Sequence, residues 1–186
     1  MGTVGRAQRR LSSWVSMSGD DGYSLRPATP GDGEAVSALL EASYPRLLAP
    51  DYDARLLAVA LPLMTRANPR LLASGTYYVA ETGSDAVVGC GGWTVEAPGG
   101  GSRPGVGHIR HFAIHPEWTR RGIGRALLDR CVEEVRAHGI RNLECFSTLT
   151  AEAFYRSAGF ATVGPVDVPM SPTVAFPGVH MRLLLA

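Results

Sequence analysis

Apolar and polar residues alternate along this chain in short runs that predict strands, and recur at helical spacing in longer runs that predict helices. The elements expected in the first half are a strand at Tyr23–Pro27, a helix from about Pro30 to Ala42, a second helix from Asp51 to about Ala67, and a hairpin of the runs Thr76–Thr82 and Ala86–Glu96. Thr29 and Pro30 open the first helix as a capping residue and a proline at the first helical position. Pro62 interrupts the second helix, because proline supplies no backbone N–H.

The second half alternates strands and helices after a loop at Ala97–Gly107 that is rich in glycine and proline. The elements expected there are a strand at His108–His115, a helix at Gly122–His138, a strand at Asn142–Phe146, a helix at Thr150–Ala158, and strands at Phe160–Val166 and Val179–Leu185 with a proline-rich loop between them. The pattern predicts an α+β fold, a mixed sheet flanked by about four helices, without internal repeats.

A chain of 186 residues is long enough to bury the core of one domain. We therefore expect a single domain over residues 22–186, preceded by a disordered extension over residues 1–21. That extension contains arginines but lacks the apolar stretch of a signal peptide. No apolar run reaches the roughly 18 residues of a membrane-spanning helix. The net charge of +1 argues against a nucleic-acid partner and against an acidic membrane surface.

The basic residues are 18 arginines and no lysine. This composition excludes a phosphate-binding loop with the Gly-Lys-Ser/Thr motif, a Schiff base and a lysine nucleophile. The three cysteines, Cys90, Cys131 and Cys145, are too few and too far apart for a disulfide framework or a Cys-x-x-Cys metal site. We therefore expect a reducing, cytoplasmic setting and no metal.

The strongest chemical signal is a strand, a tight turn and a helix around Gly122 and Gly124. Neither glycine carries a Cβ, so the backbone can approach a ligand closely, and the first helical turn leaves amide N–H groups unpaired. Together with Arg120, Arg121 and Arg125, this is the composition of a pyrophosphate-binding cradle. A dinucleotide-binding Rossmann turn is a poor alternative, because its third glycine would fall at Leu127.

The run Thr119–Leu128 after Ala113–Pro116 resembles the acetyl-CoA signature of GCN5-related N-acetyltransferases (the GNAT superfamily). The run Ala151–Phe160 is similar to the Ala-x-x-Phe-Tyr-x-x-x-Gly-Phe motif of the same family, and the order of elements also fits. The resemblance implies a mixed, mostly antiparallel central sheet of about seven strands, and acetyl-CoA as acyl-donor co-substrate. Thr119 departs from the usual Gln or Arg, and Thr148 stands where an Asn often precedes the short helix.

The resemblance also implies site residues. Backbone groups of the strand would pair with the pantetheine arm, the N–H of Ile114 would polarise the thioester carbonyl, and the turn amides would hold the pyrophosphate. The cofactor-binding residues implied in this way are Phe112, Ala113, Ile114, Arg120, Arg121, Gly122, Ile123, Gly124, Arg125 and Ala126. Tyr155 matches the tyrosine that protonates the departing thiolate in many relatives; the alternative is a core aromatic residue beside Phe154 and Phe160.

The general base implied by the resemblance is His108, at the start of the strand that ends in the cradle. The alternative is an exposed histidine that only follows the glycine-rich loop. On ideal pleating, His108 shares a face with Arg110 and Phe112 while His111 points the other way, and a bulge would reverse this parity.

The sequence therefore predicts an N-acetyltransferase that moves an acetyl group from acetyl-CoA to a primary amine by direct attack on the thioester. A non-catalytic acyl-CoA-binding sensor of the same fold is the alternative. The acceptor stays open among polyamines, amino acids, aminoglycoside-like compounds and protein N-termini. We expect the loop Ala97–Gly107 and the stretch Tyr44–Arg70 to shape the acceptor site. Because an open sheet has edge strands that can pair with a second copy, a homodimer is a further expectation that the sequence does not decide.

Overall fold

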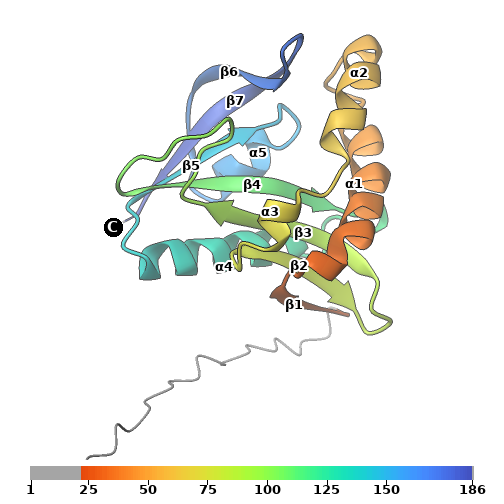
Figure 1. Ribbon diagram of the computed structural model, residues 1–186, viewed down its shortest axis with the longest axis horizontal. Coiled ribbons are helices and arrows are strands. Elements are labelled where there is room, and N and C mark those ends of the chain that lie inside the picture. Colours follow the sequence, from red (N-terminus) through yellow and green to blue (C-terminus); the bar gives the residue numbers. More distant parts are fainter. Residues whose placement is uncertain (1–21, 186) are drawn as a thin grey trace, which may run out of the picture.

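The computed structural model describes residues 22–185, and the disordered extension expected over residues 1–21 lies outside them. A seven-stranded sheet forms the centre of the molecule, in the order β1-β2-β3-β4-β5-β7-β6 (Figure 1). Its strands are β1 (Tyr23–Pro27), β2 (Tyr77–Thr82), β3 (Val87–Thr94), β4 (Val106–Ile114), β5 (Asn142–Ser147), β6 (Ala161–Ser171) and β7 (Val174–Leu184). Only β4 and β5 pair in parallel. The expected mixed, mostly antiparallel sheet of seven strands is confirmed.

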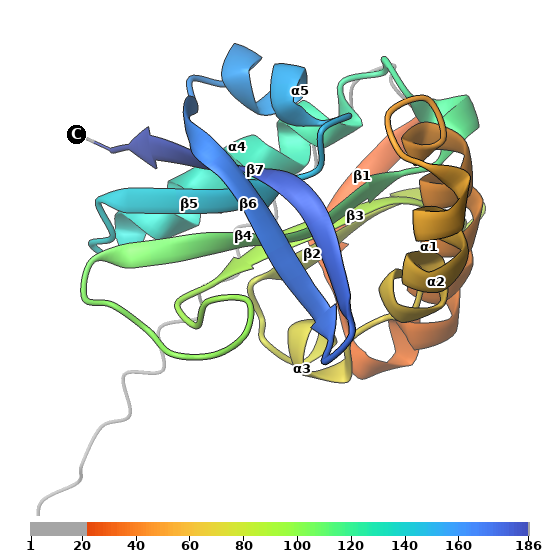
Figure 2. The same ribbon diagram turned by 90° about the horizontal axis from the view of Figure 1, so that it is seen from above.

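Helices cover both faces of the sheet. They are η1 (Pro30–Asp32), α1 (Gly33–Leu48), α2 (Ala54–Met64), α3 (Pro69–Leu72), η2 (Pro116–Trp118), α4 (Ile123–Ala137) and α5 (Glu152–Ser157). Alternate residues of β2 separate the faces: Tyr77 packs with α1, whereas Tyr78 packs with α4. Figure 2 shows α1 and α2 together at one side of the molecule, with α4 behind the sheet. Among the described helices, none is both long and apolar enough to cross a membrane.

Strands β4 and β5 separate after a short stretch of pairing. Val106, Gly107 and His108 pair with Asn142, Leu143 and Glu144, and no register pair follows on either described strand. The rest of β4 pairs only with β3, and the rest of β5 pairs only with β7. The two halves of the sheet therefore open like a wedge towards the N-terminus of α4.

A bulge reverses the faces of β4 at His111, whose φ angle is +45°. The register with β3 shifts between Cys90 and Gly92, opposite this residue. Before the bulge Ile109 packs against the α4 side, and after it Phe112 packs on that same side. The ideal-pleating expectation that His108 and Phe112 share a face is therefore wrong, and the bulged alternative is correct.

Several predicted elements are shorter than the observed ones, because their expected ends lie close to prolines. Helix α1 runs on to Leu48 past Pro45, which is exposed and removes only one hydrogen bond. Strands β6 and β7 occupy most of the stretch expected to be a proline-rich loop. Prolines are tolerated there because β6 is an edge strand and β7 pairs with β5 only from Val179 onward. The four-residue α3 gives no periodic signal and was not expected.

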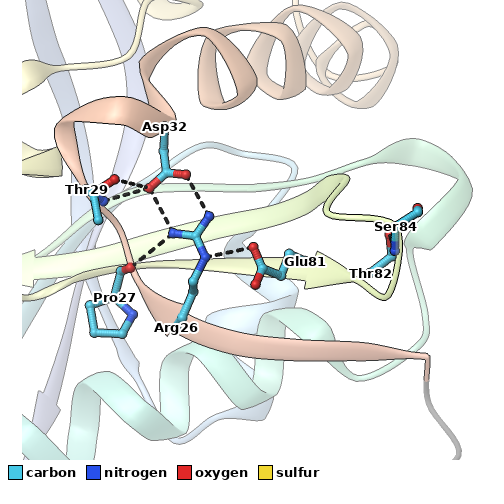
Figure 3. A network of polar contacts seen from close by, with 7 residues as sticks. All are labelled: Arg26, Pro27, Thr29, Asp32, Glu81, Thr82 and Ser84. Carbon is cyan, nitrogen blue, oxygen red and sulfur yellow. Dashed lines mark hydrogen bonds and ion pairs between the residues drawn. The ribbon is translucent and has the colours of Figure 1, made fainter.

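A polar network fixes the start of α1 against the sheet (Figure 3). The guanidinium of Arg26 donates to both carboxylate oxygens of Asp32, at 2.7 and 2.9 Å, and to Glu81 on β2 at 2.7 Å. Asp32 also accepts from the backbone N–H of Thr29 at 2.7 Å. This network ties β1, β2 and the first turn before α1 together, and thereby positions the helix that carries Ser43 and Tyr44.

Candidate active site

A cleft of about 390 Å³ fills the gap between the separated strands β4 and β5. Its walls are the β4 residues Ile109–Ile114 and the β5 residues Cys145–Ser147. The α4 and α5 side adds Gly124, Ala151, Phe154 and Tyr155, and the opposite side adds residues of α1, α2 and the β6–β7 hairpin. The cleft therefore passes through the sheet and connects its two faces.

The end of the cleft beside α4 is the place where the sequence predicts an anion cradle. Gly122 is the N-cap of α4 at a φ of +81°, no side chain caps the helix, and Arg120 also has a positive φ of +63°. The first-turn amides therefore have no intrahelical partner. A Cβ built on Gly124 would lie at ordinary van der Waals distance, 3.5 Å, from the ring of Phe154.

The three arginines of the cradle lie in different surroundings. Arg125 pairs with Asp129 one turn along the helix at 2.9 Å, and Arg121 lies 4.5 Å over the ring of Trp118. Arg120 is exposed and has no ion pair within residues 22–185. Exposed cations are adaptable contacts for a phosphate, whereas the backbone amides are fixed.

Hydroxyl groups hold the carbonyl oxygens of β4 along the cleft. Ser43 donates to the carbonyl of Ile114 at 2.8 Å, and Tyr77 donates to that of His111 at 2.9 Å. The N–H of His115 donates to Val88 on β3. Because neighbouring residues of a strand alternate in direction, the N–H of Ile114 points away from β3 and towards the gap. An extended chain lying in the gap would meet this donor.

Tyr155 is 4 % exposed and lines the cleft. Its ring lies edge-on to three phenylalanine rings, those of Phe112, Phe154 and Phe160. Burial, followed by the neighbouring Cys145 thiol, raises the pKa of the Tyr155 hydroxyl well above its usual range. The side chain is therefore a core aromatic residue that keeps a protonated hydroxyl at the cleft.

His108 lies outside the lining of the cleft. It is 3 % exposed and its Nε2 has no hydrogen-bond partner among the described residues. It neighbours Glu144, which is also buried and accepts from Arg103 at 2.6 Å, with His180 and Arg182 at 3.4 and 3.5 Å. Burial lowers the pKa of His108 despite the attraction of Glu144. A neutral imidazole therefore stands behind the wall of the cleft.

Sequence reasoning missed two polar residues that do line the cleft. His111, at the bulge, is partly buried, and desolvation by the surrounding protein lowers its pKa to about 4. Arg110 precedes it and faces the α1 side. Only the register shift of β4 brings both to the cleft, and a periodicity argument cannot locate such a shift. The two departures from the family motif, Thr119 and Thr148, both line the cleft, and Thr148 accepts from the N–H of Ala151 at 3.2 Å.

Comparison with known proteins agrees with this architecture. Residues 73–162 match the model of the acetyltransferase (GNAT) domain. A relative, the IAA acetyltransferase of Azospirillum brasilense, is 36% identical over 110 residues, which are 56% of this chain and 64% of that protein. The match thus spans slightly less than two thirds of the relative's length.

Solved structures share the fold at low sequence identity. A GCN5-related N-acetyltransferase from Rhodopseudomonas palustris superimposes with a TM-score of 0.65 at 22% identity, covering 87% of this chain and 95% of that one. The PaiA N-acetyltransferase of Thermoplasma acidophilum, solved in complex with coenzyme A, gives a TM-score of 0.64 at 14% identity, covering 88% and 99%. The matched domain and the shared fold thus agree with the resemblance to the GNAT acetyltransferases: residues 73–162 match that domain, and the described chain has the fold of the GNAT structures.

Proposed function

We propose that this protein is an acetyl-CoA-dependent N-acetyltransferase that acts on a primary amine. The observation that carries the proposal is the cleft through the sheet, which connects the uncapped N-terminus of α4 with an apolar pocket on the opposite face. Such a passage lets a thioester and an acceptor approach from opposite sides and meet beside β4. The coenzyme A complex of the Thermoplasma relative supports an acyl-CoA as donor.

The residues proposed to bind the donor fit a diphosphate and an extended thiol arm. The amides of residues 120–126 would hold the pyrophosphate, because they lie at the positive end of the helix dipole and those of the first turn have no intrahelical partner; the N–H of Ala126 already donates to Gly122 at 2.9 Å. The arm would lie along Phe112, Ala113 and Ile114, where backbone groups face the gap. The N–H of Ile114 would donate to the thioester carbonyl and stabilise the negative charge that develops there.

The proposed step is an acyl transfer without a covalent enzyme intermediate. An acceptor that has lost one proton attacks the carbonyl carbon, a C–N bond forms and the C–S bond breaks. The nitrogen gives up its extra proton as the amide forms, and the thiolate of coenzyme A takes up a proton and leaves as the free thiol. Holding both reactants in one cleft supplies much of the rate acceleration.

Tyr155, which the sequence predicts as the acid, is proposed to donate a hydrogen bond from its protonated hydroxyl to the departing thiolate, because the side chain lines the cleft. His108 remains the proposed base of the sequence, and from behind the wall it would need a proton relay to reach the acceptor. His111 is the competing candidate, because it lines the cleft itself. Both imidazoles are neutral at physiological pH, since burial lowers both pKa values.

The proposed location, the absence of a metal from the chemistry and the choice of enzyme over sensor have indirect support. The three cysteine thiols are free and buried, which supports a proposed reducing, cytoplasmic location. Within residues 22–185 no cluster of three or more metal-ligating side chains occurs, and the proposed chemistry uses no metal. No observation favours the acyl-CoA sensor over the enzyme.

The test combines donor binding with turnover. We expect acetyl-CoA at 100 times its Kd to stabilise the wild-type protein by about 2.7 kcal/mol, a rise in Tm of about 5–10 °C. Gly124→Glu should abolish this rise, because it places a carboxylate where the pyrophosphate belongs. Gly83→Glu is the matched control, since Gly83 lies in a surface turn with open space around it.

Turnover is then measured as release of free coenzyme A thiol across a panel of primary amines. Thiol release that depends on the amine supports the transferase. Stabilisation by acetyl-CoA without release for any amine would favour the sensor. No stabilisation at all would refute both.

A further inference from the structure

The end of the cleft remote from α4 is apolar. Helices α1 and α2 and the β6–β7 hairpin contribute its walls, and they pack against one another in a shared core. The apolar side chains that line this end are Leu47, Leu48, Met64, Val168, Met170 and Phe176. A ligand group that enters here exchanges water for hydrocarbon, so an apolar body is favoured.

Among the described residues that line the cleft, Arg110 is the only Asp, Glu, Lys or Arg. It precedes the bulge of β4 and so faces this apolar end rather than α4. Its Nη1 donates to the hydroxyl of Thr94 at 2.9 Å and to the carbonyl oxygen of Glu96 at 3.2 Å. Both acceptors are neutral oxygens, and within residues 22–185 Arg110 makes no ion pair.

The environment of Arg110 disfavours its charge. Burial lowers the pKa of the guanidinium, and the carboxylate of Glu96 offsets this only from outside ion-pair distance. The buried carboxylate of the neighbouring strand, Glu144, is already taken up by Arg103, Arg182 and His180. A half-buried arginine without an anion is stabilised by any anionic ligand group that reaches it.

The lack of a lining carboxylate also bears on the acceptor. An acceptor with several ammonium groups, such as a polyamine or an aminoglycoside-like compound, needs acidic side chains to hold its remaining charges. The lining residues of this cleft contain none. The cleft therefore repels a polycation near Arg110 and offers it no counter-charge.

We propose that the acceptor is a primary amine that carries a carboxylate on an apolar body, and that Arg110 binds this carboxylate. The proposal rests on the transferase function and specifies its substrate class. Free apolar amino acids have the required groups. Their amino group would lie towards Ile114 and Tyr155, and their side chain would pack against α2 and the β6–β7 hairpin.

The experiment compares matched pairs of acceptors that differ only in charge. Phenylalanine, leucine, methionine and tryptophan are each assayed beside the corresponding amino acid amide, with spermidine as the polycation. The readout is kcat/KM from thiol release, measured at equal concentrations of the unprotonated amine. We expect the acids to exceed the amides by about ten- to a hundredfold, the range for hydrogen bonds to a charged group.

The Arg110→Gln variant should remove this preference. It should lower kcat/KM for the acids to the level of the amides, while leaving the amides and the acetyl-CoA-dependent rise in Tm unchanged. A purely structural role of Arg110 would instead lower both series equally. Arg136→Gln is the matched control, because Arg136 is exposed at the far end of α4. It should keep the preference for acids.

An inhibitor gives a second readout that does not need turnover of the acid. 3-Phenylpropionate has the apolar body and the carboxylate but no amine, and it should compete with the acceptor in the wild type and lose potency about tenfold in Arg110→Gln. Amides or spermidine acetylated as well as the acids would overturn this inference while the transferase stands. Binding of acetyl-CoA without thiol release in either series would overturn the transferase, and this inference with it.

Discussion

At the scale of single residues, the burial of Tyr155 decides what its hydroxyl can do. The pKa lies well above the usual 10 because the ring is enclosed among phenylalanines and beside the Cys145 thiol. The hydroxyl is therefore fully protonated at neutral pH and is available as a donor. Full proton transfer to an alkyl thiolate is uphill for so weak an acid. Tyr155 is thus better suited to stabilise the developing thiolate through a hydrogen bond.

Tyr155→Phe should lower kcat about a hundredfold and leave the Kd for acetyl-CoA within about twofold. The aromatic core stays filled, so the fold should tolerate the loss of one hydroxyl. Pre-steady-state thiol release and a binding titration provide the two readouts. Tyr78→Phe is the control, since Tyr78 is equally buried but lies outside the lining of the cleft. Unchanged turnover in Tyr155→Phe would remove this residue from the chemistry.

The same kinetic assay separates the two histidine candidates. If His111 takes the proton directly, His111→Gln lowers kcat and His108→Gln has less effect. If His108 acts through a relay, the order is reversed. Because burial lowers both pKa values, neither imidazole should introduce a loss of activity as the pH falls from 8 to 6.5. A steep loss centred near 6.5 would contradict these buried environments.

At the scale of elements, α1 depends on the charged network at its start. The hydrogen bonds from Arg26, opposed by burial and supplemented by Thr29, lower the pKa of Asp32 from 3.8 to about 2. A carboxyl group with a lowered pKa in the folded state stabilises the protein above its unfolded pKa. That contribution disappears as the pH falls from about 4 towards 2.

Asp32→Asn should therefore lower the free energy of unfolding by about 2 kcal/mol at pH 6. The difference from the wild type should shrink as the pH is lowered through 4 and should be small near pH 2. Urea unfolding followed by circular dichroism at several pH values measures it. Asp167→Asn on the exposed edge strand β6 is the control and should stay within about 0.5 kcal/mol of the wild type. A difference that does not vary with pH would show that the charge of Asp32 is not what stabilises α1.

Elements with strong periodicity were predictable from sequence, and those that depend on tertiary contacts were not. The helix at Gly122–His138 corresponds to α4 (Ile123–Ala137), because its apolar face and the glycines at its ends are local signals. Prolines misled the prediction of β6 and β7, because only the position of a strand in the sheet decides whether proline is tolerated. A bulge on this strand was an open alternative, but its position at His111 could not be predicted, although Gly91 opposite marks it: a Cβ there would lie 2.5 Å from the ring of Phe112. The glycines of the cradle could be predicted from local sequence, whereas placing Arg110 and His111 at the cleft required the register of β4 against β3.

At the scale of the whole molecule, the open sheet weakens the connection between the two halves of the sheet, and the shared core strengthens it. The wedge between β4 and β5 leaves few backbone contacts between the halves β1–β4 and β5–β7. One hydrophobic cluster nevertheless contains Trp93 and Ile109 from the first half and Leu143 and Met181 from the second, with α4 beneath both. The cleft can therefore stay open without dividing the domain. We accordingly propose that residues 22–186 form a single domain.

Leu128 of α4 tests this proposal, because it is 1 % exposed in the core that joins the two halves. Leu128→Ala should destabilise the protein by about 2–5 kcal/mol, and the loss should shift one cooperative transition rather than split it. Urea unfolding followed in parallel by circular dichroism and tryptophan fluorescence should give coincident curves in both proteins. Leu184→Ala removes the same atoms from a side chain that is 73 % exposed and should change stability by less than about 0.5 kcal/mol. Two separated transitions, with only one moved by Leu128→Ala, would mean that the halves of the sheet unfold independently and that the cleft is a boundary between two units.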